Sequence, residues 1–113
     1  MNTSNLLQWN EFQKIDMRVG VILEVSPFPE AIRPAYRLLI DFGQLGTRKS
    51  SAQITNYRTK DLVGRQVVAV VNFPPKQIGR FISEVLLLGA IDETGQVKLL
   101  RPDVDCELGS KVS

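Results

Sequence analysis

Short runs that alternate between apolar and polar residues, each closed by glycine or proline, most strongly limit the fold of this 113-residue chain. A period of two is that of a β-strand with one buried face. In the first run, five apolar side chains recur at every second position and should share that face: Met17, Val19, Val21, Leu23 and Val25. Pro27 and Pro29 then end the predicted strand.

Further strands are expected along the rest of the chain, although their patterns differ. They are predicted at residues 36–42, 48–54, 66–71, 82–88 and 97–100. Five or six short strands without alternating helices favour an all-β fold, a small closed or nearly closed barrel. The length suits one domain spanning residues 1–113.

Two short helices should accompany these strands. Apolar residues recur at helical spacing from Leu6 through Trp9 to Phe12, after a polar segment, residues 2–5, that supplies a candidate cap. Residues 59–64 predict a single helical turn between strands, with the threonine as its cap and the glycine as its stop.

Two of the strand-like runs are apolar on both faces, which an isolated barrel does not explain. They are VVAVV at 67–71 and VLLL at 85–88. A strand whose outer face meets water should alternate. The N-terminal helix, the C-terminal segment or a second subunit must therefore cover them, and a symmetric homodimer is the simplest cover.

The composition argues against an enzyme. The chain has no histidine, which removes the usual general base at neutral pH and the commonest transition-metal ligand. Its single cysteine, Cys106, can form neither an internal disulfide nor a zinc site alone. We therefore expect no catalytic residues, no metal and no cofactor.

The sequence also suggests a location. No apolar run approaches the roughly 18 residues of a membrane span, and the first 13 residues lack the pattern of a secretory signal. We expect a cytoplasmic protein that is not inserted into a membrane.

Positive charge is concentrated in the middle of the chain. The formal net charge is +2, but residues 33–80 carry nine lysines and arginines against two aspartates. A surface that binds phosphates needs such a concentration of cations. A fold can also scatter these side chains over a solvated surface, so charge alone leaves both interpretations open.

The polar segment RKSSAQI, residues 48–54, places cations, hydroxyls and an amide close together. In an extended strand the odd-numbered residues Lys49, Ser51 and Gln53 face one side and the even-numbered residues the other, so one set can line a groove. Such groups contact phosphate, ribose and base edges. A polar edge strand kept soluble by charge has the same composition.

The segment NFPPKQIGRFISE, residues 72–84, carries more chemistry than a strand connection needs. Its two prolines stiffen the loop and lower the entropy lost when Phe73, Lys76 or Gln77 meets a ligand. Phe73 is the candidate for stacking on a base or an apolar side chain. Glu84 should accept hydrogen bonds from backbone amides or an arginine, because it lies in an otherwise apolar run.

Several motifs in one order make the chain resemble the CsaA family of small tRNA-binding-domain proteins. They are PFPEA at 27–31, YRLLIDFG at 36–43, SSAQI at 50–54, VVAVVNFPPKQIG at 67–79 and SEVLLLGA at 83–90. The resemblance extends from about Trp9 to the C-terminus. Ser51-Ala52-Gln53 and Ile82 stand where tRNA-binding domains appended to other proteins tend to carry a Ser-Gly-Leu-like segment and a methionine. These differences place the chain in the CsaA branch.

The resemblance implies a five-stranded oligonucleotide/oligosaccharide-binding (OB) barrel and homodimerisation through segments that flank it. It implies tRNA binding without base-specific reading, and a chaperone role towards unfolded polypeptides destined for export, with the export machinery as a further partner. A tRNA-binding dimer and a peptide-binding chaperone thus remain two hypotheses, and one groove can serve both. The candidate contact residues for either ligand are Arg33, Arg37, Arg48, Lys49, Ser51, Gln53, Asn72, Phe73, Lys76, Gln77, Arg80, Ser83 and Glu84.

Overall fold

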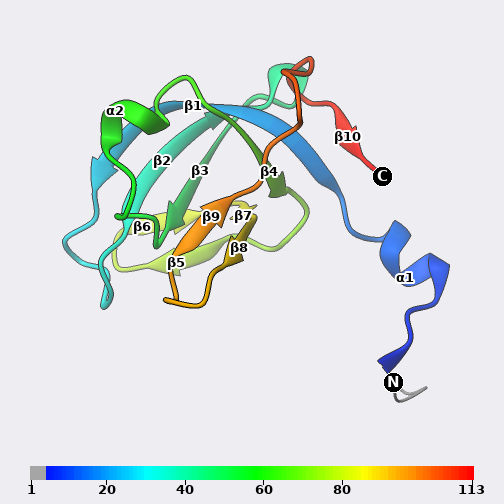
Figure 1. Ribbon diagram of the computed structural model, residues 1–113, viewed down its shortest axis with the longest axis horizontal. Coiled ribbons are helices and arrows are strands. Elements are labelled where there is room, and N and C mark those ends of the chain that lie inside the picture. Colours follow the sequence, from blue (N-terminus) through cyan, green and yellow to red (C-terminus); the bar gives the residue numbers. More distant parts are fainter. Residues whose placement is uncertain (1–4) are drawn as a thin grey trace.

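Five antiparallel strands curl into a nearly closed barrel in the computed structural model, which describes residues 5–113 (Figure 1). Their order in the sheet is β3-β2-β1-β4-β7, and β10 pairs with the start of β1. The bounds are β1 Met17–Pro27, β2 Tyr36–Asp41, β3 Thr47–Ala52, β4 Gln66–Val70, β7 Leu86–Leu87 and β10 Lys111–Val112. The expected all-β barrel is confirmed.

Smaller elements complete the fold. Two hairpins pair β5 with β6 and β8 with β9. The bounds are α1 Trp9–Gln13, the 3-10 helix η2 Gly43–Leu45, α2 Thr59–Leu62, β5 Lys76–Ile78, β6 Phe81–Ser83, β8 Gly89–Ile91 and β9 Val97–Leu99. None of the helices within residues 5–113 is long and apolar enough to cross a membrane.

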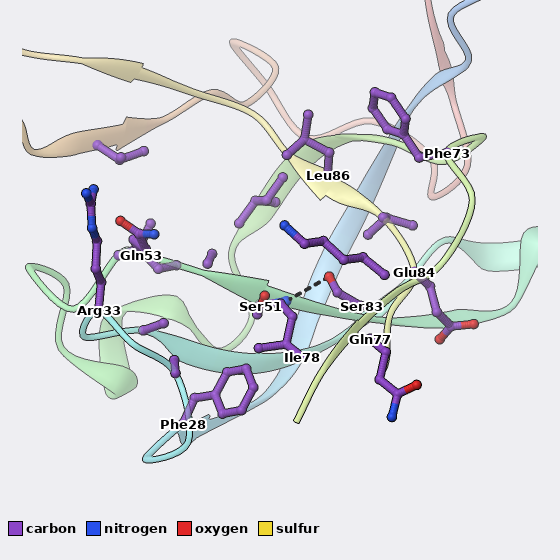
Figure 2. A pocket seen from close by; sticks show the side chains of 18 of the residues that line it. Phe28, Arg33, Ser51, Gln53, Phe73, Gln77, Ile78, Ser83, Glu84 and Leu86 are labelled. Atoms are coloured by element: carbon purple, nitrogen blue, oxygen red, sulfur yellow. Dashed lines mark hydrogen bonds between the residues drawn. The ribbon is translucent and has the colours of Figure 1, made fainter. Parts of the chain in front are cut away.

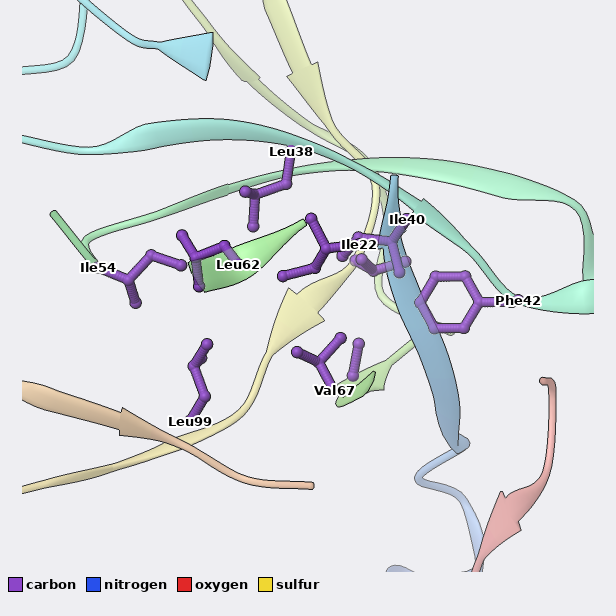
Figure 3. Packing of buried hydrophobic residues seen from close by; sticks show 10 residues of the cluster. Ile22, Leu38, Ile40, Phe42, Ile54, Leu62, Val67 and Leu99 are labelled. Carbon is purple, nitrogen blue, oxygen red and sulfur yellow. The ribbon is translucent and has the colours of Figure 1, made fainter. Parts of the chain in front are cut away.

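The core fills the barrel with aliphatic side chains and one phenylalanine ring (Figure 3). Its buried members are Ile22, Leu38, Ile40, Phe42, Ile54, Leu62, Val67, Ala69, Val85 and Leu99. Leu62 joins this core from α2, which is the expected helical turn. Thr59 is the first residue of that helix rather than its cap, and Gly64 follows the helix with a φ of +86°.

The face of β1 that lines the barrel interior is not the one that the alternation predicts, although Val19 on the predicted face is also buried. Gly20 and Ile22, on the opposite face, point into the barrel, because a Cβ on Gly20 would lie 2.7 Å from Ile40 Cγ2 and 2.8 Å from the Phe42 ring. Glycine at this position leaves room for the phenylalanine. The face that reads as polar in the sequence therefore contains the closest packing of the strand.

A register shift then turns the second half of β1. The pairing with β2 is irregular between Ile22 and Glu24, and Leu23 between them is 41% exposed. A bulge adds one residue to a strand and exchanges its faces. Val25 consequently packs against the core. The prediction of a single apolar face from Met17 to Val25 is wrong for these two reasons.

The outer face of β4 is covered by the chain's own C-terminal segment, which crosses it in Figure 1. The Gln66 side chain donates to the Cys106 carbonyl at 2.7 Å and accepts from the Cys106 amide at 3.0 Å. On the same face, Val68 and Val70 are only 8% and 6% exposed. The run at 67–71 therefore gives no argument for a second subunit, whereas Leu86 in the run at 85–88 remains 50% exposed.

Helix α1 is shorter than expected and projects from the barrel (Figure 1). It begins at Trp9, after the Gln8 amide donates to the Glu11 carboxylate at 2.8 Å. Asn5 is therefore not its cap, and the other candidate caps, Thr3 and Ser4, lie outside the described residues. None of the helix residues is buried, so the apolar stripe is not docked on the barrel.

Candidate functional site

The segment 72–84 is an arm built on the hairpin β5–β6. A two-residue turn joins its strands, with Gly79 at the first central position and a φ of +60°. Glycine at that position is the requirement of a type II′ turn, whose twist matches the flanking strands. The polar segment at 48–54 provides β3, against which β6 packs.

The Ser83-Glu84 pair fastens the arm to the open edge of β3. The Glu84 amide donates to the Lys49 carbonyl at 2.7 Å, and a Glu84 carboxylate oxygen accepts from the Lys49 amide at 2.9 Å. The Ser51 amide donates to the Ser83 hydroxyl at 3.2 Å. The expectation that Glu84 accepts from a backbone amide is confirmed. These side chains thus satisfy edge groups that would otherwise need a further strand.

Ser50 strengthens the same junction from inside the barrel. It is fully buried, and its hydroxyl lies 3.2 Å from both the Val85 and the Ser51 carbonyl oxygens. A buried hydroxyl is costly without such partners. Ser50 of the SSAQI motif therefore helps to hold the end of the arm through its hydroxyl, whereas Ser51 contributes only its backbone amide.

An open cavity of about 1040 Å³ lies between this arm, the end of β3 and the loop after β1 (Figure 2). Much of its lining is apolar, including Ile54, Ile78, Val85, Leu87 and Leu99. Phe73 and Leu86 line it as well and are 54% and 50% exposed. Eight of the thirteen candidate contact residues line it: Arg33, Ser51, Gln53, Phe73, Lys76, Gln77, Ser83 and Glu84.

An aromatic pair lies between this cavity and a second, smaller depression. Phe28 lines the cavity, Phe81 lines the depression, and their ring centroids are 5.3 Å apart. The Arg37 guanidinium carbon lies 5.7 Å from the Phe28 centroid, and Lys49 Nζ lies 5.6 Å from the Phe81 centroid. Both cations line the depression, whose volume is about 240 Å³, and neither lines the cavity.

Arg37 and Lys49 share one face of the sheet. Arg37 is paired with Ser51 and Lys49 with Leu39, so the two cations are diagonal neighbours on adjacent strands. Arg37 Nε donates to the Pro27 carbonyl at 3.1 Å. Within residues 5–113 neither cation forms an ion pair, whereas Arg18, Arg58 and Lys98 pair with Asp16, Asp61 and Asp92 respectively.

The three remaining candidates line neither hollow. Arg48 Nη1 lies 3.4 Å from the Thr47 carbonyl oxygen, and Arg80 is exposed in the turn of the arm. Asn72, which follows β4, holds the segment that leads into the neighbouring strand β1: it accepts from the Asp16 amide at 3.0 Å and donates to the Lys14 carbonyl at 2.7 Å. These contacts give Asn72 a structural role in the chain.

Apart from Phe73, the sequence reasoning did not identify the apolar lining of the cavity. Ile32, which is fully exposed in the loop after β1, and Leu86 both line the cavity, yet in the sequence they read as ordinary apolar residues. A signal existed in the VLLL run, because a strand that is apolar on both faces must meet something on each. In the part of the chain that the structure describes, no group of three or more acidic or cysteine side chains is placed to hold a metal ion.

Comparisons with known proteins agree with this geometry. Residues 17–111 match the family model described as "Putative tRNA binding domain". The crystal structure of a CsaA chaperone protein from Picrophilus torridus has 58% identity and a TM-score of 0.91, covering 96% of this chain and 100% of that chain. Chaperone CsaA from Bacillus anthracis has 49% identity and a TM-score of 0.91, covering 96% and 99%.

Two larger enzymes are also similar over a small part of their length. A methionine–tRNA ligase from Methanocaldococcus jannaschii is 35% identical over 100 residues, which cover 88% of this chain and 15% of the ligase. A second ligase, from Porphyromonas gingivalis, is 33% identical over 106 residues, again 15% of its length. The chain thus spans about 15% of the length of these curated relatives.

Proposed function

The chain belongs to the family of tRNA-binding domains, and on this premise we propose that it binds tRNA through the outer face of β2 and β3. The observation that carries the proposal is the pair of cations, Arg37 and Lys49, that lie on this face without an ion pair in residues 5–113. Glu24 lines the same depression but forms no ion pair with either cation in these residues, so a phosphate can bind without first breaking an ion pair.

This arrangement suits recognition of a folded RNA by its backbone. The β2–β3 face is where OB barrels bind oligonucleotides, and phosphate contacts fix the position of an RNA without reading its sequence. Arg80, exposed at the turn of the arm, can extend the contact beyond the sheet. The protein acts here as a binding module that performs no catalysis.

Salt dependence measures this contact directly. Binding of total tRNA should weaken steeply between about 50 mM and 200 mM salt, because each phosphate contact releases counterions. Arg37→Gln combined with Lys49→Gln should lower the slope of log K against log salt by about 1.5, at about 0.7 to 0.9 per contact. Arg58→Gln is the matched control, since its guanidinium pairs with Asp61 at 2.8 Å. Equal wild-type affinity at both salt concentrations would refute RNA binding through phosphates.

A second candidate function is the binding of unfolded polypeptide segments, and the apolar cavity favours it. Phe73 and Leu86 are about half exposed at that cavity, and burying such side chains against a client is favourable. Polypeptides destined for export are the clients that the resemblance to CsaA implies. Suppression of client aggregation should fall in Phe73→Ser and persist in Ile91→Ser, which removes an exposed apolar side chain outside the cavity. Equal loss in both variants would contradict a role for the cavity.

The same proposal includes a homodimer. Leu6 and Leu7, which precede α1, and Trp9, its first residue, form an apolar surface whose side chains are 54%, 69% and 72% exposed. The part of the chain that carries this surface projects from the barrel (Figure 1). A second copy can cover it symmetrically. Sedimentation at micromolar concentration should give twice the chain mass, and Trp9→Ser should shift the mass towards that of one chain. A wild-type mass of one chain would remove the dimer from the proposal.

A further inference from the structure

The arm that borders the cavity ends in an open strand edge. Within residues 5–113 β5 pairs with β6 alone, and β6 is the strand that packs against β3. The outer side of β5 therefore carries main-chain groups with no neighbouring strand. An open edge is a template for pairing with another extended chain.

The register of the hairpin identifies which groups are open. Ile78 and Phe81 flank the two-residue turn and form the first pair, and Gln77 is opposite Ile82. In such a hairpin the pair next to the turn is hydrogen-bonded and the following pair is not. The Gln77 amide and carbonyl therefore point away from β6, and no hydrogen bond to either occurs within the described residues.

The open edge lies at the apolar cavity. All three residues of β5 line the cavity. Figure 2 shows the Ile78 side chain on the side of Phe28, while the Gln77 side chain points away from it. A chain added along this edge would alternate its side chains in the same way. Every second side chain would then enter the cavity.

The charges around the cavity specify the occupant further. Arg33 and Lys76 line it and have no ion pair in the described part of the chain. Among the described residues that line the cavity, Glu84 is the only acidic one, and one of its carboxylate oxygens already accepts from the Lys49 amide. Two unpaired cations against one engaged carboxylate complement an acidic residue in the ligand.

We propose that the cavity captures extended polypeptide segments by strand addition to β5, with alternate apolar side chains inside and an acidic residue beside Arg33 or Lys76. The inference rests on the proposed polypeptide-binding function and specifies its substrate class. Main-chain hydrogen bonds at Gln77 would supply affinity independent of sequence, and the cavity would select apolar residues at alternate positions. Pro74 and Pro75 limit this edge to the few residues of β5.

Backbone N-methylation of a ligand tests the inference without altering the protein. The probe is a short fluorescent peptide with alternating leucine and serine and one aspartate, together with derivatives that each carry one N-methyl group. Methylation at the residue whose amide faces β5 should weaken binding about tenfold, the effect of losing a hydrogen bond and adding a clash. Methylation at the next residue, whose amide points away, should leave the affinity nearly unchanged.

A matched pair of variants tests the same contact from the protein side. Gln77→Pro removes the outward amide, whereas Gln77→Ala removes only the side chain, and circular dichroism checks that both retain the fold. Only the proline variant should bind the parent peptide more weakly. Replacing the aspartate of the peptide with lysine should also weaken its binding to the wild-type protein. If Gln77→Pro does not fold, the N-methyl series alone decides the inference.

The possible outcomes separate the two proposals. Equal affinity of the parent peptide and all N-methyl derivatives would overturn strand addition and leave polypeptide binding intact. No measurable binding of the parent peptide or of an unfolded client would overturn polypeptide binding itself. Complete displacement of the peptide by a short single-stranded RNA would overturn the inference by assigning the cavity to nucleic acid.

Discussion

Replacing Glu84 tests whether the arm is held as the structure shows. Glu84→Ala removes the carboxylate oxygen that accepts from the Lys49 amide at 2.9 Å. A hydrogen bond to a charged group contributes about 1.5–3 kcal/mol, and partial solvent access reduces this to about 1–2 kcal/mol here. Glu84→Gln loses the same charge but keeps an acceptor oxygen, so we expect it to lose less than about 1 kcal/mol.

Urea unfolding at constant temperature measures both variants. The slope of the free energy of unfolding against urea should be unchanged, so the midpoint alone reports stability. For a chain of this size the alanine variant should also lower Tm by about 3–6 °C per kcal/mol. Equal midpoints for the alanine and glutamine variants would refute the hydrogen bond as a source of stability, because their charges are the same.

Three further results are expected. Gly20→Ala should lower stability by about 1–3 kcal/mol in urea unfolding, because its methyl group overlaps the core, and an unchanged midpoint would contradict the packing of β1. The Thr94 hydroxyl holds the pKa of Asp92 below its ordinary value. Asp92→Asn should therefore be less stable to unfolding than the wild type at neutral pH, and this loss of stability should vanish as the pH falls through the lowered pKa. A loss of stability that does not change with pH would exclude this cause. A bound peptide should remain bound when tRNA is added, and mutual displacement would show one shared site.

The barrel could be predicted from the sequence because its strands are short, punctuated and mostly half-buried. The faces of β1 could not, because the critical residue is Gly20, whose lack of a side chain carries no apolar signal. Packing of Phe42 against that glycine is a contact between distant positions. The register shift after Ile22 is equally invisible, since Leu23 reads as one more apolar residue in the alternation.

The cover of β4 depended on a similar long-range contact. The apolar run correctly indicates that both faces of the strand are buried. What buries the outer face is the C-terminal segment, which Gln66 holds through Cys106. From the sequence alone, the N-terminal helix, the C-terminal segment and a second subunit are equally plausible covers for the outer face of β4. The Gln66 side chain does not distinguish them, because its hydrogen-bonding partner lies 40 positions away in the sequence.

The candidate cations in the middle of the chain are divided between two hollows. This division changes how the RNA-binding and polypeptide-binding hypotheses relate to each other. Arg37 and Lys49 lie at the depression beyond Phe81, while Arg33 and Lys76 belong to the apolar cavity. A single groove would force RNA and polypeptide to compete. With the Phe28–Phe81 pair between the two hollows, the two proposed ligands would contact different charged residues. The two proposed activities are therefore compatible in one barrel.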